Sequence, residues 1–221
     1  MRAFFFILIL IIISLSVGAW YSMQSLPYWA DNERSNTQAT IEGLSANIRE
    51  KGIRQFLSNK AHGILKGVVN FDELEFNAIL LASLQGDKNG RKLLSVSDSI
   101  RAFLKEDRLH ITAIINLKKL QRVEPKSRKA IEKFNRLFPF LNKSRMAVTV
   151  YATPIARKKQ LAIKDDFYIK VGAIPISNES LKALGVNVER VNFTELPIKY
   201  LSIKSVKLAP NLITLDVSPR L

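Results

Sequence analysis

The sequence predicts an α+β protein with an N-terminal transmembrane helix followed by one domain of long antiparallel β-hairpins covered by helices. Three patterns support this class: a long apolar run opens the chain, apolar residues then recur at helical spacing, and from about residue 100 their period changes to two. Strands that cluster in hairpins, and do not alternate singly with helices, indicate a largely antiparallel sheet. We expect a membrane anchor with an aromatic belt over residues 1–30 and a single extracytoplasmic α+β domain over residues 31–221.

The apolar run, residues 3–21, reads AFFFILILIIISLSVGAWY and holds no charged side chain. Its 19 residues span about 28 Å as a helix, close to the hydrocarbon thickness of a bilayer. Arg2 and the α-amino group supply the positive flank. We therefore expect a single-pass protein of the inner membrane, with its N-terminus in the cytoplasm and its domain in the periplasm or outside the cell. The side chains expected to anchor it are Phe4, Phe5, Phe6, Leu8, Leu10, Ile12, Trp20, Tyr21 and Trp29.

A cleaved signal peptide is the main alternative to an anchor, because Val17-Gly18-Ala19 offers the small residues that a signal peptidase accepts. Two features favour the anchor. The apolar run is longer than the usual signal-peptide core of about 7–15 residues. Both tryptophans, with two tyrosines, lie at the end of the run or just past it, as in an interfacial aromatic belt. A buried helix is the third alternative.

The domain is expected to begin with a helix from about Asn36 to Leu57, because apolar residues recur there at helical spacing, with a break or kink at Gly52. Residues 63–67 (GILKG) are interpreted as a flexible loop. A second, buried helix is expected from Asn70, whose side chain can cap it together with Glu73 in a capping box. The residues GDKNG at 86–90 are expected to end this helix as a plain turn.

Alternating apolar residues predict a hairpin of residues 100–104 and 109–117 with one buried face, and the alternation places His110 on the polar face. Pro125 is expected to start a basic helix that Pro139 stops. The other expected elements are strands at Met146–Ala152 and Leu161–Ala173, the second bulged at Asp165, a short helix at Asn178–Leu184, and a final hairpin of Tyr200–Leu208 with Leu212–Val217.

Several of these segments share their order with a known family. They are the helix at residues 71–81 (FDELEFNAILL), the strand at 107–111 (DRLHI), the strand at 168–177 (YIKVGAIPIS) and the closing strands at 203–208 and 212–217. Their order resembles the YpmS-like family of bacterial membrane-anchored proteins, which have no established activity. The resemblance covers roughly residues 71–217, and the basic run between Lys118 and Arg145 departs from it. The layout also resembles lipid-binding domains built from long curved hairpins around an apolar groove. Neither resemblance supplies catalytic residues.

Composition and motifs argue against several kinds of chemistry. The chain has no cysteine, which excludes disulfides, thiolate metal sites and a cysteine nucleophile. The sequence holds no G-x-S-x-G, G-x-G-x-x-G or P-loop motif. Asp165-Asp166 has no third ligand near it, and His110 has no neighbouring nucleophile or orienting group, so structural roles are favoured for both. We expect no cofactor, no metal and no enzymatic activity.

The net charge of +15 indicates an anionic partner or surface, and over half of it lies in one segment. Lys118–Arg145 holds ten Lys or Arg and two Glu, a net charge of +8. Its expected amphipathic helix can lie on an anionic membrane or cover the sheet with its lysines facing water. Because the domain is expected to lie outside the cytoplasm, we do not expect a nucleic acid as its partner. The expected basic surface comprises Lys118, Lys119, Arg122, Lys126, Arg128, Lys129, Lys133 and Arg136.

Two functions fit these patterns best. The first is a membrane-anchored extracytoplasmic binding protein of the bacterial envelope that holds a lipid or other apolar ligand between its hairpins and helices. The alternative is an envelope interaction or scaffold protein whose basic patch binds an anionic glycan, the membrane surface or a protein partner. An enzyme whose active site carries no recognisable motif is the third hypothesis.

Overall fold

The computed structural model describes residues 26–27, 29–32, 37–105, 108–123, 145–157, 159–164, 166–176 and 201–219. The predicted membrane segment, the basic helix after Pro125 and the short helix at 178–184 lie outside these residues. Within the described ranges, no helix is both long and apolar enough to cross a bilayer.

Short helices precede and interrupt a series of antiparallel strands. The helices are α2 (Trp29–Asn32), α3 (Thr37–Lys51), α4 (Ile53–Ser58), α5 (Ala61–Leu65), α6 (Glu73–Gly86), α7 (Lys88–Val96) and α8 (Leu117–Val123). The strands are β1 (Val68–Asp72), β2 (Ser97–Lys105), β3 (Arg108–Asn116), β4 (Arg145–Ala152), β5 (Pro154–Arg157), β6 (Gln160–Ile163), β7 (Tyr168–Val171), β8 (Ile174–Ile176), β9 (Leu201–Ala209) and β10 (Leu212–Pro219).

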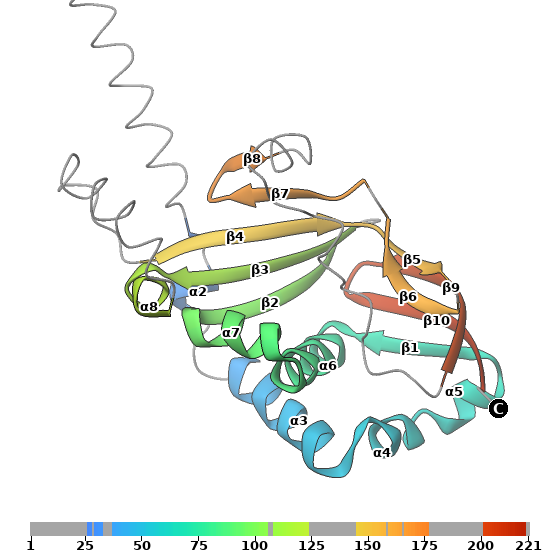
Figure 1. Ribbon diagram of the computed structural model, residues 1–221. Helices are drawn as coiled ribbons and strands as arrows, with labels where there is room; N and C mark the ends of the chain where they lie inside the picture. Colours follow the sequence, from blue (N-terminus) through green and yellow to red (C-terminus); the bar gives the residue numbers. More distant parts are fainter. Residues whose placement is uncertain are drawn as a thin grey trace, which may run out of the picture.

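The described strands form three antiparallel sheets (Figure 1). A curved five-stranded sheet has the order β2-β3-β4-β7-β8, and a three-stranded sheet has the order β1-β10-β9. The hairpin of β5 and β6 lies against β9, where the Ile203 amide donates to the Lys159 carbonyl at 3.0 Å. This arrangement confirms the predicted α+β class and the two long hairpins, β2–β3 and β9–β10.

Helices cover one face of the five-stranded sheet, which we call the inner face. Figure 1 shows α6 and α7 beneath β2, with α3 packed against α6 on the far side. The inner residues Ala102, Leu104 and Leu109 are at most 3% exposed and join one core with Phe76 and Ile79 of α6. The three-stranded sheet closes the same core from the side with Val69, Phe71, Leu201, Ile203, Ile213, Leu215 and Val217.

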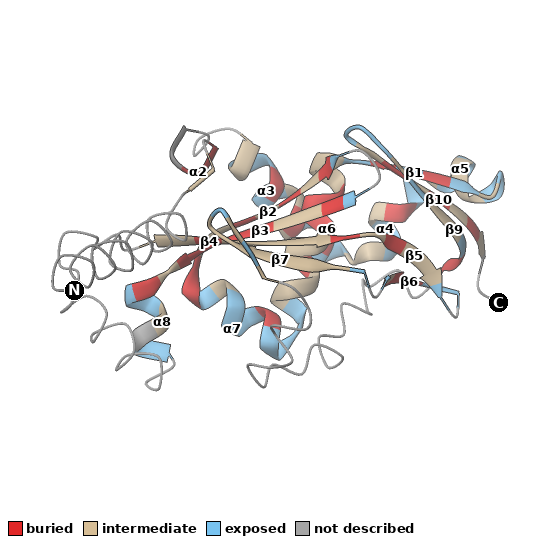
Figure 2. Ribbon diagram, turned by 90° about the horizontal axis from the view of Figure 1, so that it is seen from above, coloured by how far each residue is buried: buried red, intermediate tan, exposed pale blue. Residues whose placement is uncertain are grey.

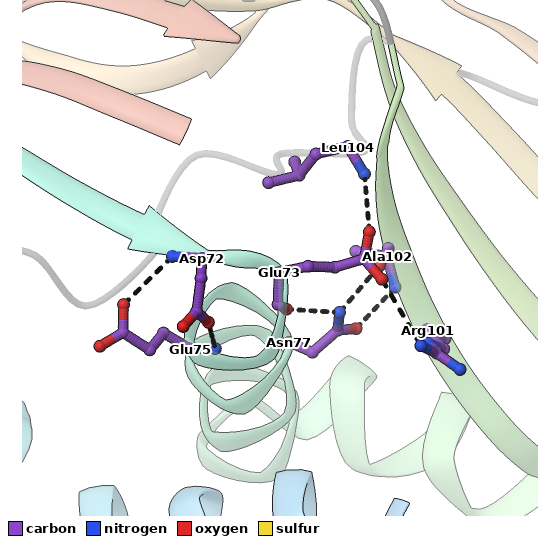
Figure 3. A network of polar contacts seen from close by, with 7 residues as sticks. All are labelled: Asp72, Glu73, Glu75, Asn77, Arg101, Ala102 and Leu104. Carbon is purple, nitrogen blue, oxygen red and sulfur yellow. Dashed lines mark hydrogen bonds and ion pairs between the residues drawn. The ribbon is translucent and has the colours of Figure 1, made fainter. Parts of the chain in front are cut away.

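One buried side chain joins α6 to the edge of the five-stranded sheet (Figure 3). Asn77 is 2% exposed, and its amide pairs with both backbone groups of Ala102: Nδ2 donates to the carbonyl at 2.8 Å, and Oδ1 accepts from the N–H at 2.6 Å. One turn earlier, the Glu73 carboxylate accepts from the Leu104 amide at 3.3 Å. The Leu104 carbonyl in turn accepts from the Asn211 amide at 3.2 Å. The edge of β2 is therefore hydrogen-bonded although none of the described strands pairs with it there.

The predicted start of the second helix needs correction. The capping box exists, but it joins Asp72 and Glu75, not Asn70 and Glu73 (Figure 3). The helix starts later because residues 68–72 form β1, whose register with β10 pairs Asn70 with Thr214. The sequence pattern missed β1, since its five residues are too few to show a strand period beside a helical one.

Of the three glycine-containing segments that were expected to interrupt helices, two are partly helical. Residues 86–90 end the second helix as expected, since α6 stops at Gly86, but they are not a plain turn: Asp87 is the N-cap of α7 and accepts from the Gly90 amide at 2.7 Å. The expected loop at 63–67 contains most of the short helix α5, and Gly67 follows it at φ +79°. The expected break at Gly52 is confirmed, because this residue separates α3 from α4 at φ +80°.

The predicted strand at 161–173 is two strands that belong to different sheets. β6 pairs with β5, whereas β7 pairs with β4 and β8. Asp165 lies outside the described residues, and its neighbour Asp166 forms an ion pair with Lys164 at 3.5 Å. The apolar alternation of the sequence continues across the break, so the period alone could not place the boundary.

Replacing Asn77 with alanine should destabilise the fold by about 2–4 kcal/mol, because both backbone groups of Ala102 would be left buried without their partner. Urea denaturation of the detergent-solubilised full chain measures this loss. The matched control is Asn70→Ala on the exposed side of β1, where we expect a change within about 0.5 kcal/mol. Equal midpoints for the two variants would contradict the role given to Asn77.

Gly90→Ala should cost about 1–3 kcal/mol, because a Cβ at this position would lie 2.3 Å from the Leu84 carbonyl oxygen and would push α7 off the end of α6. Gly86→Ala is the control, since a Cβ there meets no atom within 4 Å. A thermal unfolding series on the two variants tests the contact. Similar melting temperatures for both would show that the α6–α7 corner tolerates the added carbon.

Candidate functional site

The other face of the five-stranded sheet, which we call the outer face, carries rings and cations where the inner face carries aliphatic residues. Strand side chains alternate between faces, so the register places one set of residues together here. These ten positions hold four cations, four rings and two threonines, with no acidic residue among them. They are Arg101, Phe103, Lys105, Arg108, His110, Thr112, Thr149, Tyr151, Tyr168 and Lys170.

A row of four rings crosses this face at right angles to the strands. Phe103 pairs with His110, His110 with Tyr151 and Tyr151 with Tyr168 in the register of β2, β3, β4 and β7. The His110 and Tyr151 rings lie 4.3 Å apart, and the Tyr151 and Tyr168 rings stack at 4.5 Å with an interplanar angle of 3°. Figure 2 shows β7 at intermediate exposure along its length, so this end of the row is reachable from solvent.

Three cations lie over rings of this row. The Arg101 guanidinium carbon is 4.9 Å from the Phe103 centroid, the Lys170 Nζ is 5.0 Å from Tyr151, and the Arg108 guanidinium carbon is 5.7 Å from Tyr168. All three distances are within the about 6 Å that a cation–π contact requires. Arg101 also forms an ion pair with Glu73 at 3.5 Å. These contacts place three positively charged groups over the rings of the row.

The chain entering from the N-terminal side closes one end of this face. Trp29 is 8% exposed, and its ring lies 5.5 Å from Phe103. A hollow of about 330 Å³ lies between this segment and the sheet. That volume is at the low end of the about 300–1,000 Å³ found for small-ligand sites. Its lining includes Pro27, Trp29, Lys105, His110, Thr149 and Tyr151.

A second polar cluster lies at the start of β2, around Asp98. Its side chain is 14% exposed, and Lys119 Nζ donates to it at 3.0 Å while Asn116 Nδ2 donates at 3.2 and 3.3 Å. Burial raises the pKa of the Asp98 carboxyl, but the hydrogen bonds from Lys119 and Asn116, with the charges of Lys119 and Arg145, outweigh it. The pKa therefore lies below its ordinary value of 3.8. Asn116 also accepts from the amides of Lys118 and Lys119, which fixes the start of α8.

Four of the residues expected to be functional lie within the described ranges. Trp29 is the one expected anchor residue within the described ranges, and it packs with Ala30, Ile114 and Ala147. Lys118, Lys119 and Arg122 lie on α8. The other expected anchor and basic residues lie outside the described part, namely Phe4, Phe5, Phe6, Leu8, Leu10, Ile12, Trp20, Tyr21, Lys126, Arg128, Lys129, Lys133 and Arg136.

Sequence reasoning missed the row of rings. The alternation correctly placed His110 on the polar face, but the strand pairings that bring Tyr151 and Tyr168 beside it are set by the sheet order. The available signal was an aromatic residue at an outward position in each of β2, β4 and β7. No group of three or more His, Asp or Glu side chains with metal-binding spacing occurs among the described residues.

Asp98→Asn should reduce stability at neutral pH by about 0.5–1.5 kcal/mol, because it removes the charge that Lys119 and Arg145 favour. Since the folded pKa is lowered, the carboxylate stabilises the fold above its ordinary pKa and loses this effect as the pH falls through the folded value. The wild-type chain should thus lose more stability on acidification than the variant. Urea midpoints between about pH 5 and pH 3 measure the difference.

The control for Asp98 is Asp166→Asn, which removes a carboxylate that is 38% exposed. Its acid dependence should follow that of the wild type. Parallel curves for the wild type and Asp98→Asn would contradict the assigned role of the Lys119–Asn116–Asp98 cluster.

Known proteins offer no relative from which a role could be carried over to this chain. No family model matches it, and neither a curated protein nor a solved structure with significant similarity was found. The YpmS-like resemblance therefore stays a prediction from the order of segments.

Proposed function

We propose that the chain is a membrane-anchored, extracytoplasmic binding protein of the bacterial envelope whose outer sheet face binds an anionic glycan. The observation that carries this proposal is the row Phe103–His110–Tyr151–Tyr168, with cations over three of its rings. The proposed role is binding without catalysis. The anchor is the apolar run at residues 3–21.

The chemistry of the face suits sugars that carry acidic groups. The flat rings of Tyr151 and Tyr168 offer surfaces on which the C–H face of a sugar can stack, at a low cost in side-chain entropy. The Thr149 hydroxyl, which shares a hydrogen bond of 2.9 Å with the buried Thr112, offers a further hydrogen bond beside these rings. Lys170 and the exposed Arg108 supply charge for a carboxylate or phosphate.

The dimensions favour a polymer over a single sugar. Three strand-to-strand spacings of about 4.8 Å give the row a length of about 14 Å. A linear chain of a few sugar rings, lying across the strands, covers this distance. The hollow under Trp29 is lined by Phe103, His110 and Tyr151 of the row, and it offers a place for one sugar ring of the polymer.

The lipid ligand that the sequence suggests stays a prediction, and the described residues favour it less. The space between the inner face and α6 is filled by a core whose members are mostly below 5% exposed. Two further hollows, each of about 350 Å³, lie beside α3 and are lined by charged residues that include Glu42 and Asp98. Neither lining suits an acyl chain, because burying these carboxylates against apolar groups is costly.

Titration of the full chain in nanodiscs with polygalacturonate, a polymer of uronic acids, tests the proposal directly. We expect saturable binding that weakens with salt, and no binding of neutral dextran. Tyr151→Ala should weaken binding by about tenfold or more, in line with the about 1–3 kcal/mol measured for a ring that stacks a nucleic-acid base. Tyr151→Phe keeps the ring and should retain most of the affinity.

Two comparisons make the result specific. Lys170→Ala should weaken binding, whereas Lys204→Ala, which removes an exposed cation on β9, should not. A single-stranded oligonucleotide serves as competitor, because rings and cations on a sheet also stack bases. Binding that prefers the oligonucleotide, or that is indifferent to Tyr151→Ala, would overturn the glycan assignment.

A further inference from the structure

Two segments of the chain leave the domain at the same end of the five-stranded sheet. The β3–β4 ladder ends with the pair Asn116 and Arg145, so the connection between these strands starts and ends here. The N-terminal segment reaches the sheet here too, because Trp29 and Ala30 pack against Ile114 and Ala147, a pair two positions inside the end of the ladder. Figures 1 and 2 both show α2 and α8 at this end, opposite the C-terminus.

The two segments share one surface hollow. A cavity of about 350 Å³ is lined by Trp29 and Ala30 of α2, by Lys119 of α8 and by Arg145 of β4. The start of α8 is fixed relative to the sheet through Asn116, which caps it, and through Asp98, which holds Lys119. The position of α8 relative to Trp29 is therefore set by the fold.

The distance to the apolar run is short. Seven residues separate Tyr21, the last residue of the run, from Trp29. A fully extended chain of this length spans about 28 Å at most. With residues 3–21 in a bilayer, this end of the domain stays within that distance of the headgroups, while the opposite end, at α5, does not have to approach them.

The helix α8 at this end of the sheet is positively charged. The seven residues of α8 (LKKLQRV) include three cations and no acid, and Lys118 and Arg122 are exposed. The sequence that follows, residues 124–144, adds six Lys or Arg against two Glu. Clusters of cations beside a membrane segment attract anionic lipids within a Debye length of about 8–10 Å.

We infer that α8 contacts the headgroups of anionic phospholipids and orients the domain with this end of the sheet against the membrane. The inference rests on the proposed anchor but not on glycan binding, which uses other residues. Lys118 and Arg122 make the contact, whereas Lys119 is held by Asp98. Each of these two contacting cations should favour the docked orientation about fivefold, which corresponds to about 1 kcal/mol.

The absence of cysteine from the chain allows a single dye to be placed without background. One variant carries the dye at Val123→Cys on α8, where the side chain is 39% exposed, and a second carries it at Leu65→Cys on α5, which is 82% exposed. The full chain is placed in nanodiscs whose lipid headgroups bear a nitroxide quencher. Discs of phosphatidylglycerol with phosphatidylcholine are compared with discs of phosphatidylcholine alone.

We expect strong quenching at position 123 in the anionic discs, weaker quenching there in the neutral discs, and little at position 65 in either. Lys118→Glu with Arg122→Glu should lower the ratio of docked to undocked molecules by at least tenfold, in line with two cations at about fivefold each. Lys51→Glu with Lys66→Glu makes the same change in charge on exposed residues away from α8 and should leave the ratio unchanged.

Three results would overturn the inference. They are equal quenching at positions 123 and 65, quenching at 123 that does not depend on anionic lipid, and a charge-reversed α8 that docks as well as the wild type. Glycan titration of the same variants separates this result from the proposed function. Loss of orientation with intact glycan binding, or the reverse, assigns the failure to one proposal alone.

Discussion

The pairing of the Asn77 amide with Ala102 is the constraint on which the rest of the architecture depends. An edge strand presents unpaired backbone groups that favour association with other chains. In this fold a helix side chain supplies both the acceptor and the donor that a neighbouring strand would supply. Because the amide fits only in one position along β2, it fixes how far α6 slides along the sheet. Glu73 and Asn211 satisfy the next positions of the same edge, so α6 and the β9–β10 turn are located by one set of backbone groups.

Fixing α6 on the inner face determines what the outer face can become. The aliphatic side chains on the inner face of β2 and β3 pack against α6 and α7. On the outer face Ile114 and Ala147 pack against Trp29, and the remaining outward positions are not needed for the core around α6. Rings and cations can occupy them without loss of core. The curved sheet then acts as a rigid frame for the row Phe103–His110–Tyr151–Tyr168, and the cations over its rings are held by contacts that lie within the face.

Local patterns predicted the parts of the fold that are governed by local forces. The β2–β3 and β9–β10 hairpins, the break at Gly52, and the presence of a buried helix that ends at Gly86 follow from period and turn chemistry. The short strand β1 and the split of residues 161–173 between two sheets depend on partners far along the chain, which a period cannot reveal. The candidate site could be predicted only in its local features too. Alternation placed His110 outward, but its neighbours Phe103 and Tyr151 come from other strands, so the row emerges only from the sheet order.

The pairing of Asn116 with Arg145 also has an evolutionary consequence. These residues close the β3–β4 ladder, so the 28 residues between them start and finish at one fixed point of the sheet. The entropy of closing such a connection grows slowly with its length, by about 0.6 kcal/mol for each doubling. Insertions and deletions in this segment therefore change the free energy of folding very little. Its length and charge can change during evolution, while the hydrogen-bonded β3–β4 ladder stays unchanged.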